Sequence, residues 1–101
     1  MTVFKISDGK RIDVSINSDV CLYRAPEGMA GIDIYAHKAP SGTMYYYTYA
    51  WSTTHPPVYS IITPADVQDL LIRRASLPVY YGRLTDDDVK LAEQHFPGIF
   101  K

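Results

Sequence analysis

The stretch Met44–Ser52, MYYYTYAWS, holds four of the nine tyrosines and the only tryptophan of the chain. Aromatic and β-branched residues favour a pleated, half-buried surface, so the stretch predicts a strand. Alternate side chains of a strand share a face. One face of this strand therefore carries a row of large rings, called here the tyrosine stripe, that consists of Tyr45, Tyr47, Tyr49 and Trp51.

The segment 32–37 predicts a second strand, because its residues alternate in the same way, with one side formed by Ile32, Ile34 and Ala36. Between the two strands, residues 39–43 have the composition of a turn. An even loop centred on Ser41 and Gly42 would gather most of the bulky apolar groups on one face. The pairs that this loop predicts are Ile32 with Trp51, Ile34 with Tyr49, and Ala36 with Tyr47.

We expect the tyrosine stripe to face the core, under the helices, because tyrosine buries a large ring while its hydroxyl seeks a partner or the rim. The alternative is an exposed aromatic platform that stacks bases or sugar rings. The two arrangements lead to different functions, since only an exposed platform could hold a ligand by stacking.

Shorter strands are predicted on either side of this hairpin, at residues 3–7, 11–16, 20–24 and 58–62. Asp8-Gly9-Lys10 joins the first two as a three-residue loop, because this length puts their apolar residues on one face. The resulting pairs are Phe4 with Val14 and Ile6 with Ile12. The last strand lies at an edge or begins after the break at Pro56-Pro57, since proline cannot donate a ladder hydrogen bond.

The C-terminal part of the chain changes to a helical pattern. Thr63 can cap a helix that begins at Pro64 and ends near Ala75, and Asp66 can return the capping bond. The buried face of this helix is predicted from its spacing to be Val67, Leu70, Leu71 and Arg74. The same capping pattern, Thr85 with Asp88, precedes a second helix that ends at Pro97-Gly98 and has a buried face of Val89, Ala92 and Phe96.

These elements predict a single α+β domain over residues 1–101. It is an antiparallel meander of five or six short strands, with two C-terminal helices packed on one face. A chain of 101 residues buries roughly two thirds of its unfolded surface, so it can form a core without covalent crosslinks.

Charge and composition narrow the class of protein. The formal net charge is −1, from 10 basic and 11 acidic residues, which argues against a duplex DNA partner because such a protein needs a basic face. Cys21 is the only cysteine, which excludes an internal disulfide and suits a reducing compartment. No apolar leader or membrane-spanning run is present, so we expect a cytoplasmic protein without a membrane partner.

The residues that could carry chemistry have simpler structural explanations. The acidic run 86–88 suits the first turn of a helix better than a metal site. The histidines, His37, His55 and His95, lack metal-ligand spacing, and Cys21 is typical of a small core residue. We therefore expect no catalytic residue, no metal and no cofactor, and the sequence favours a protein that is not an enzyme. A small enzyme that uses His37 or His55 is the last-ranked alternative.

The strongest polar and aromatic cluster in the sequence consists of Arg73, Arg74, Tyr80, Tyr81 and Arg83. Three arginines near two tyrosines could hold a phosphate, a carboxylate or an acidic partner surface. The alternative is that these arginines are solvated and pair with Asp69 or with the acidic run 86–88.

The sequence is compatible with two classes of function. The first is a small soluble, non-enzymatic interaction or accessory module that is homo-oligomeric or binds a protein partner, because aromatic residues and arginine are enriched at interface cores and sheet edges invite pairing. The alternative is a protein that binds single-stranded nucleic acid or a nucleotide. It would use outward tyrosines, Tyr35 and Tyr46, together with Lys38 and Arg24.

Overall fold

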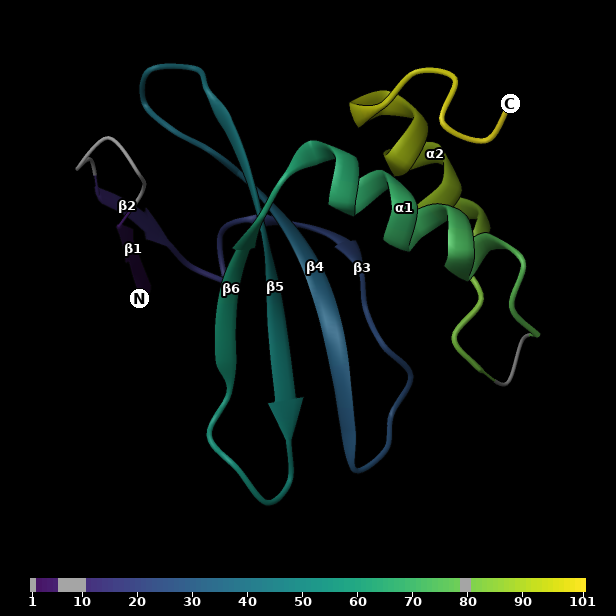
Figure 1. Cartoon of the computed structure of the whole chain (residues 1–101), viewed down its shortest axis with the longest axis horizontal. Coiled ribbons are helices and arrows are strands. Elements are labelled where there is room, and N and C mark those ends of the chain that lie inside the picture. Colours follow the sequence, from purple (N-terminus) through teal and green to yellow (C-terminus); the bar gives the residue numbers. More distant parts are fainter. Residues whose placement is uncertain (1, 6–10, 79–80) are drawn as a thin grey trace.

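The computed structural model describes residues 2–5, 11–78 and 81–101. Its elements are β1 (Thr2–Lys5), β2 (Arg11–Val14), β3 (Val20–Tyr23), β4 (Ala30–Lys38), β5 (Met44–Ser52), β6 (Val58–Ile62), α1 (Pro64–Ala75) and α2 (Asp86–His95). β1 and β2 form a separate two-stranded sheet, and β3 to β6 form a four-stranded antiparallel sheet in chain order (Figure 1). The predicted α+β class, with two C-terminal helices packed on one face, is confirmed.

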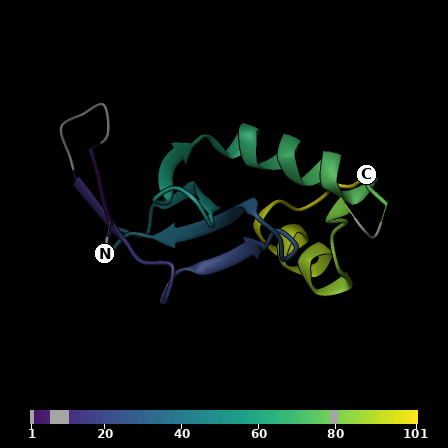
Figure 2. The same ribbon diagram turned by 90° about the horizontal axis from the view of Figure 1, so that it is seen from below.

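The larger core lies between one face of the four-stranded sheet and the two helices. Its buried residues come from the sheet, from α1, from α2 and from the segments on either side of α2: Leu22, Tyr23, Ile34, Ala36, Tyr46, Val67, Leu71, Leu84, Ala92 and Ile99. The helices and the β1–β2 hairpin lie at opposite ends of the molecule (Figure 2). The sheet therefore has different neighbours at its two ends.

Both helices begin as their sequences predict. The Thr63 side chain accepts a hydrogen bond from the backbone N–H of Asp66, and the Asp66 carboxylate accepts one from the N–H of Thr63. Thr85 and Asp88 form the same reciprocal pair at the start of α2. These bonds satisfy backbone donors that have no partner within the helix. The capping chemistry is local, so the sequence alone predicts the start of each helix.

The predicted register of β4 and β5 is wrong by one residue. Ile34 lies opposite Thr48 instead of Tyr49, and Tyr35 lies opposite Tyr47. The cause is the connecting loop, in which the N–H of Ala39 donates to the carbonyl oxygen of Thr43 at 2.9 Å. Gly42 adopts a positive φ of 91°, which is typical of a three-residue hairpin loop. An odd loop in place of an even one moves every side chain of β5 to the other face relative to β4.

As a consequence, the tyrosine stripe faces away from the helices, and the expectation that it lies under them is wrong. The stripe is covered at one end by the hairpin instead, in a second core formed by Ile12, Val14, Tyr35 and Tyr47. The rings of Tyr35 and Tyr47 stack with their centroids 5.4 Å apart. The stripe is thus buried around Tyr47, while Tyr49 and Trp51 are only half-buried.

The register of the hairpin differs by two residues from the prediction. Phe4 lies opposite Ile12, not Val14, and Val14 lies opposite Thr2. The predicted pair of Ile6 with Ile12 involves a residue outside the described part of the chain. A shift of two residues leaves every side chain on its original face. The apolar pattern therefore could not distinguish the two registers.

Candidate functional site

The described residues of the predicted arginine and tyrosine cluster differ in their exposure and in their partners. Arg73 is exposed and pairs with Asp69 at 3.0 Å, one turn earlier in α1, as the solvated alternative predicted. Arg74 is half-buried, and its guanidinium lies 4.9 Å from the centroid of the Tyr23 ring. Tyr81 and Arg83 are exposed; Tyr80 lies outside the described residues.

Tyr23, on whose ring Arg74 lies, contacts the connector between the helices. The Tyr23 hydroxyl donates to the carbonyl oxygen of Gly82 at 2.8 Å in a buried position. Tyr23 faces the helices because a register shift between Cys21 and Tyr23 places it opposite Ile34. Gly82 has a positive φ of 87°, and a Cβ there would collide with the Tyr23 hydroxyl. This part of the cluster is therefore structural.

Tyr35 and Tyr46 are buried, so the expectation that they point outward is wrong. Their exposed fractions are 3% and 5%, and they lie on opposite faces of the sheet because they belong to different cores. The indole N–H of Trp51 donates to the buried carboxylate of Asp33 at 3.1 Å. Tyr35 and Tyr46 are thus covered, and Trp51 is tied to Asp33 by a hydrogen bond.

A polar centre that the sequence did not predict lies at Asp19, in the turn before β3. One carboxylate oxygen, Oδ2, accepts hydrogen bonds from the Ser15 backbone N–H at 2.9 Å and from the Tyr47 hydroxyl at 2.7 Å. The other oxygen, Oδ1, lies 2.8 Å from His37 Nδ1. We call these four residues the Asp19 network. It joins the turn to β4 and β5.

The hydrogen-bond donors and acceptors of the Asp19 network follow from its geometry. Burial, together with the Asp19 carboxylate, raises the pKa of Tyr47 far above its ordinary value, so the Tyr47 hydroxyl stays protonated and donates. A carboxylate only accepts hydrogen bonds, so the proton between it and His37 lies on Nδ1. In neutral His37 the other ring nitrogen, Nε2, is then an acceptor.

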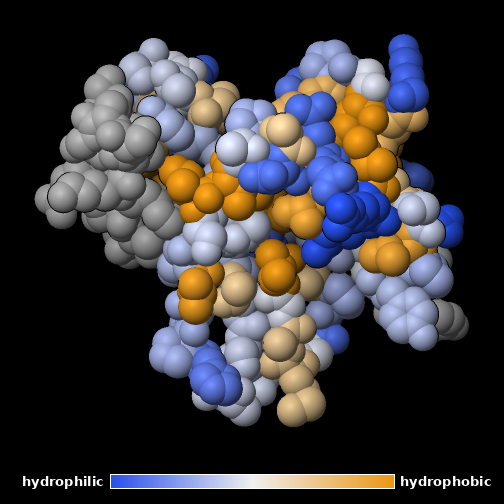
Figure 3. Space-filling model, in the orientation of Figure 1, coloured by the Kyte–Doolittle hydropathy of each residue, from blue (hydrophilic) through white to orange (hydrophobic). Residues whose placement is uncertain are grey.

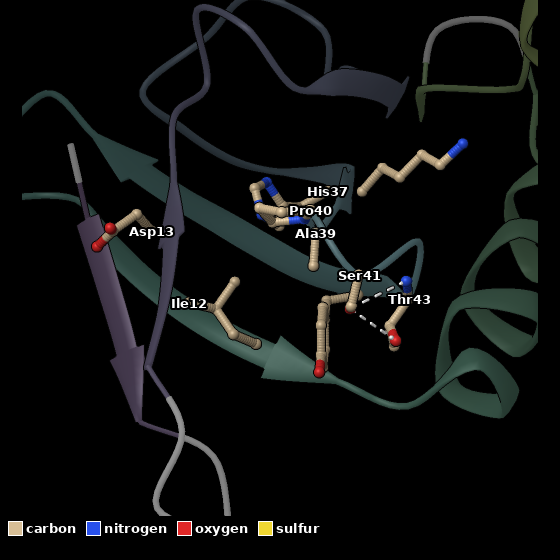
Figure 4. Close-up of a pocket in the computed structure, with 9 residues that line it drawn as sticks. Ile12, Asp13, His37, Ala39, Pro40, Ser41 and Thr43 are labelled. Atoms are coloured by element: carbon tan, nitrogen blue, oxygen red, sulfur yellow. Dashed lines mark hydrogen bonds between the residues drawn. The ribbon is translucent and has the colours of Figure 1, made fainter.

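A cleft of about 600 Å³ lies beside His37, between β2 and the β4–β5 loop. Figure 4 shows Ile12 on one side of this cleft and Ser41 and Thr43 on the other. No local feature of the sequence indicated this cleft, because Asp19, His37 and Ile12 are far apart along the chain. With the correct register, the positions of His37 and Tyr47 on one face of the sheet could have indicated a shared site.

The outer strand β6 forms a second candidate surface. In the described part of the chain no strand pairs with its outer side, and Val58 is 60% exposed. Val58 continues a row of side chains across the sheet, formed with Ala50 and Ile32, which the helices do not cover. Figure 3 shows hydrophobic side chains on this face over β4 and β6.

Comparison of the chain with protein-family models, with curated proteins and with solved structures found no match. Among the described residues, no helix is both long enough and apolar enough to cross a bilayer. The same residues contain no group of three or more His, Cys, Asp or Glu side chains that could hold a metal ion. The two candidate functional surfaces of the protein are therefore the cleft and the outer edge of β6.

His95, the last residue of α2, is half-buried against Tyr46, with ring centroids 6.2 Å apart. Burial lowers the pKa of His95 below its ordinary value. The folded state therefore favours the neutral ring, and the unfolded chain binds more protons. The stability that neutral His95 contributes is lost as the pH falls through the ordinary pKa of about 6.5 towards the lower folded value.

We expect the variant His95→Gln to lose less stability than the original protein between about pH 7.5 and pH 5.5, because glutamine does not titrate. Urea unfolding at the two pH values measures this difference. His55→Gln is the matched control, since His55 is exposed and its Nδ1 lies 2.8 Å from the hydroxyl of the neighbouring Thr54. Equal pH dependence in His95→Gln and the original protein would contradict the assignment.

Proposed function

We propose that this protein is a non-enzymatic interaction module that pairs with a second copy of itself through the outer edge of β6. The observation that supports the proposal is the composition of this edge. The five residues Val58–Ile62 contain no charged side chain, and the backbone groups on the outer side of the strand have no strand partner in the described residues. An exposed edge of this kind is a template for pairing with another strand.

The two edges of the sheet differ in how they are protected. Natural proteins block exposed edges with charges, prolines, bulges or short strands. β3, at the opposite edge, has four residues and a register shift. β6 contains no charge, proline or register shift within its length, and the nearest prolines, Pro57 and Pro64, lie outside it. This difference between β3 and β6 favours β6 as the edge that pairs with another strand.

The sequence of β6 is compatible with a two-fold axis. Two copies related by such an axis pair as antiparallel strands, and a register centred on Ser60 places Val58 opposite Ile62 of the second copy. Tyr59 then lies opposite Ile61 of the second copy. No like charges meet in this arrangement. It also joins the uncovered row of Ile32, Ala50 and Val58 to the same face of the second sheet.

A pair of short strands buries less than the roughly 1,600 Å² of a standard interface, so we expect a dimer that depends on concentration. Sedimentation equilibrium should give a dissociation constant on the order of micromolar to tens of micromolar. Ser60→Lys should make the protein monomeric, because two lysines would face each other at the axis. Ser76→Lys, at the exposed end of α1, is the matched control and should leave the dimer intact.

A crosslink tests the register directly. Side chains opposite each other across two antiparallel strands have Cβ atoms about 4.5–5.5 Å apart, which is close to the separation in a disulfide. In a Cys21→Ser background, Ser60→Cys should therefore form a covalent dimer on oxidation, and Ser76→Cys should not. A chain that remains monomeric at all concentrations, with no Ser60→Cys crosslink, would rule out the proposal.

The alternative of single-stranded nucleic acid binding rested on exposed Tyr35 and Tyr46. Both are buried, so the stacking surface that they would have formed is not exposed. We therefore do not propose it as a second function.

A further inference from the structure

The cleft beside His37 has the size of a small-molecule site. Its volume of about 600 Å³ falls within the roughly 300–1,000 Å³ that is typical of ligand pockets. It is formed by segments that are distant in the sequence, since β2 contributes one wall and the β4–β5 hairpin contributes the other. The cleft lies on the side of the sheet that the hairpin covers, so it does not depend on pairing at β6.

Most of the cleft wall that is close to the core is apolar. Ile12 belongs to the second core and is only 4% exposed. Tyr45, which is half-buried, packs against the same core, and Pro40 adds a rigid apolar surface from the loop. Flat and branched apolar groups on facing walls suit a flat ring better than a long flexible chain.

The polar groups of the cleft differ in whether other groups of the protein already satisfy their hydrogen bonds or balance their charges. The Ser41 hydroxyl donates to the Thr43 hydroxyl at 3.2 Å, so these two groups satisfy each other. Lys38 and Asp13 are exposed and carry opposite charges, which gives the rim no net preference for an anion or a cation. His37 remains as the polar group that is both held in place and open to the cleft.

His37 is held by Asp19 in one orientation and one tautomer. Its Nδ1 is used by the carboxylate at 2.8 Å, and Asp19 is fixed in turn by Ser15 and Tyr47. No hydrogen bond from a described residue reaches Nε2. A fixed acceptor beside an apolar wall selects a ligand that has a hydrogen-bond donor on an apolar body.

We propose that this cleft binds a small neutral aromatic molecule that carries a hydroxyl group, with the hydroxyl donating to His37 Nε2 and the ring lying against Ile12, Pro40 and Tyr45. The chemical class of this ligand follows from three properties of the cleft: an apolar wall, a rim without net charge, and one oriented hydrogen-bond acceptor. The site is a binding site, and no reaction step is assigned to His37.

The test compares two probes that differ by the hydroxyl donor. Phenol and anisole have the same ring, but the methyl group of anisole removes the donor. Titration of ¹⁵N-labelled protein with phenol should shift the amide signals of residues 37–45 saturably. Anisole should bind roughly tenfold more weakly, because one hydrogen bond contributes about 1 kcal/mol or more.

A matched pair of variants assigns the preference to His37. In His37→Asn the amide can still donate to Asp19, but the acceptor at the Nε2 position is lost, so phenol should bind no better than anisole. His55→Asn, at the exposed histidine, should keep the preference for phenol. The amide spectrum of each variant also reports whether it is folded.

Several results would overturn the proposal. One is the absence of saturable shifts in residues 37–45 with phenol, and another is equal affinity for phenol and anisole in the original protein. These two results do not depend on any variant being folded. A preference for phenol that survives in folded His37→Asn would also overturn it, by removing His37 as the acceptor. Ser60→Lys should not change phenol binding, so failure of dimerisation and failure of this site are distinguishable.

Discussion

Replacing Leu71 by alanine is expected to lower the free energy of unfolding by about 2–5 kcal/mol. Leu71 is fully buried in the larger core, where α1 meets the sheet. Its truncation removes apolar contacts and leaves a cavity, since the helix is held at its start by the Thr63 capping box and cannot close the gap freely. A domain of this size has a total stability of roughly 5–15 kcal/mol, so the loss should be a large fraction of it.

The neighbouring residue provides the control. Ile72 has a side chain of similar size but is 47% exposed, so Ile72→Ala should cost about 1 kcal/mol or less. Urea unfolding of the two variants, followed by circular dichroism, measures the difference. Equal losses at Leu71 and Ile72 would show that α1 does not pack on the sheet in the orientation described above.

The second large effect is expected at the Asp19 network. Asp19→Ala removes the acceptor of three donors at once, on Ser15, His37 and Tyr47. Asp19 and His37 are largely buried, with side-chain exposures of 9% and 15%. Leaving a buried donor without a partner costs about 1–3 kcal/mol, so we expect a loss of about 3 kcal/mol or more in the free energy of unfolding.

Two more conservative variants separate the contributions of the Asp19 carboxylate and the Tyr47 hydroxyl to stability. Asp19→Asn keeps the shape and one carbonyl oxygen, so it should cost less than Asp19→Ala. Tyr47→Phe removes only the hydroxyl and should cost about 1 kcal/mol. The double variant Asp19→Ala with Tyr47→Phe should cost less than the sum of the two single changes, because both break the same 2.7 Å bond. Additive losses in urea unfolding would mean that this bond contributes nothing.

The accuracy of the sequence-based predictions depended on whether the deciding interaction was local. The starts of both helices were predicted, because each capping box lies within four consecutive residues. The strands were predicted by alternation, and the prolines before β6 predicted that it lies at an edge or begins after the break. The acidic run 86–88 was correctly assigned to the first turn of α2. Each of these features needs only neighbours along the chain.

The candidate sites could not be predicted in the same way. The Asp19 network joins residues that are 4, 18 and 28 positions from Asp19, and a single sequence shows none of these contacts. Tyr35 and Tyr46 were expected outside because only one covered face was considered. In the fold, the helices cover the side of Tyr46 and the hairpin covers the side of Tyr35.

The amino-acid sequence by itself determined the class of fold, the elements and the helix ends, because these depend on propensities, periodicity and capping within short segments. The tertiary structure decided which face of the central sheet is covered by the helices and which by the β1–β2 hairpin. Both faces of β5 carry large apolar side chains, so the alternating pattern is satisfied whichever face meets the helices. One residue in the β4–β5 loop settles the register, and with it the position of the tyrosine stripe, the Asp19 network and the cleft.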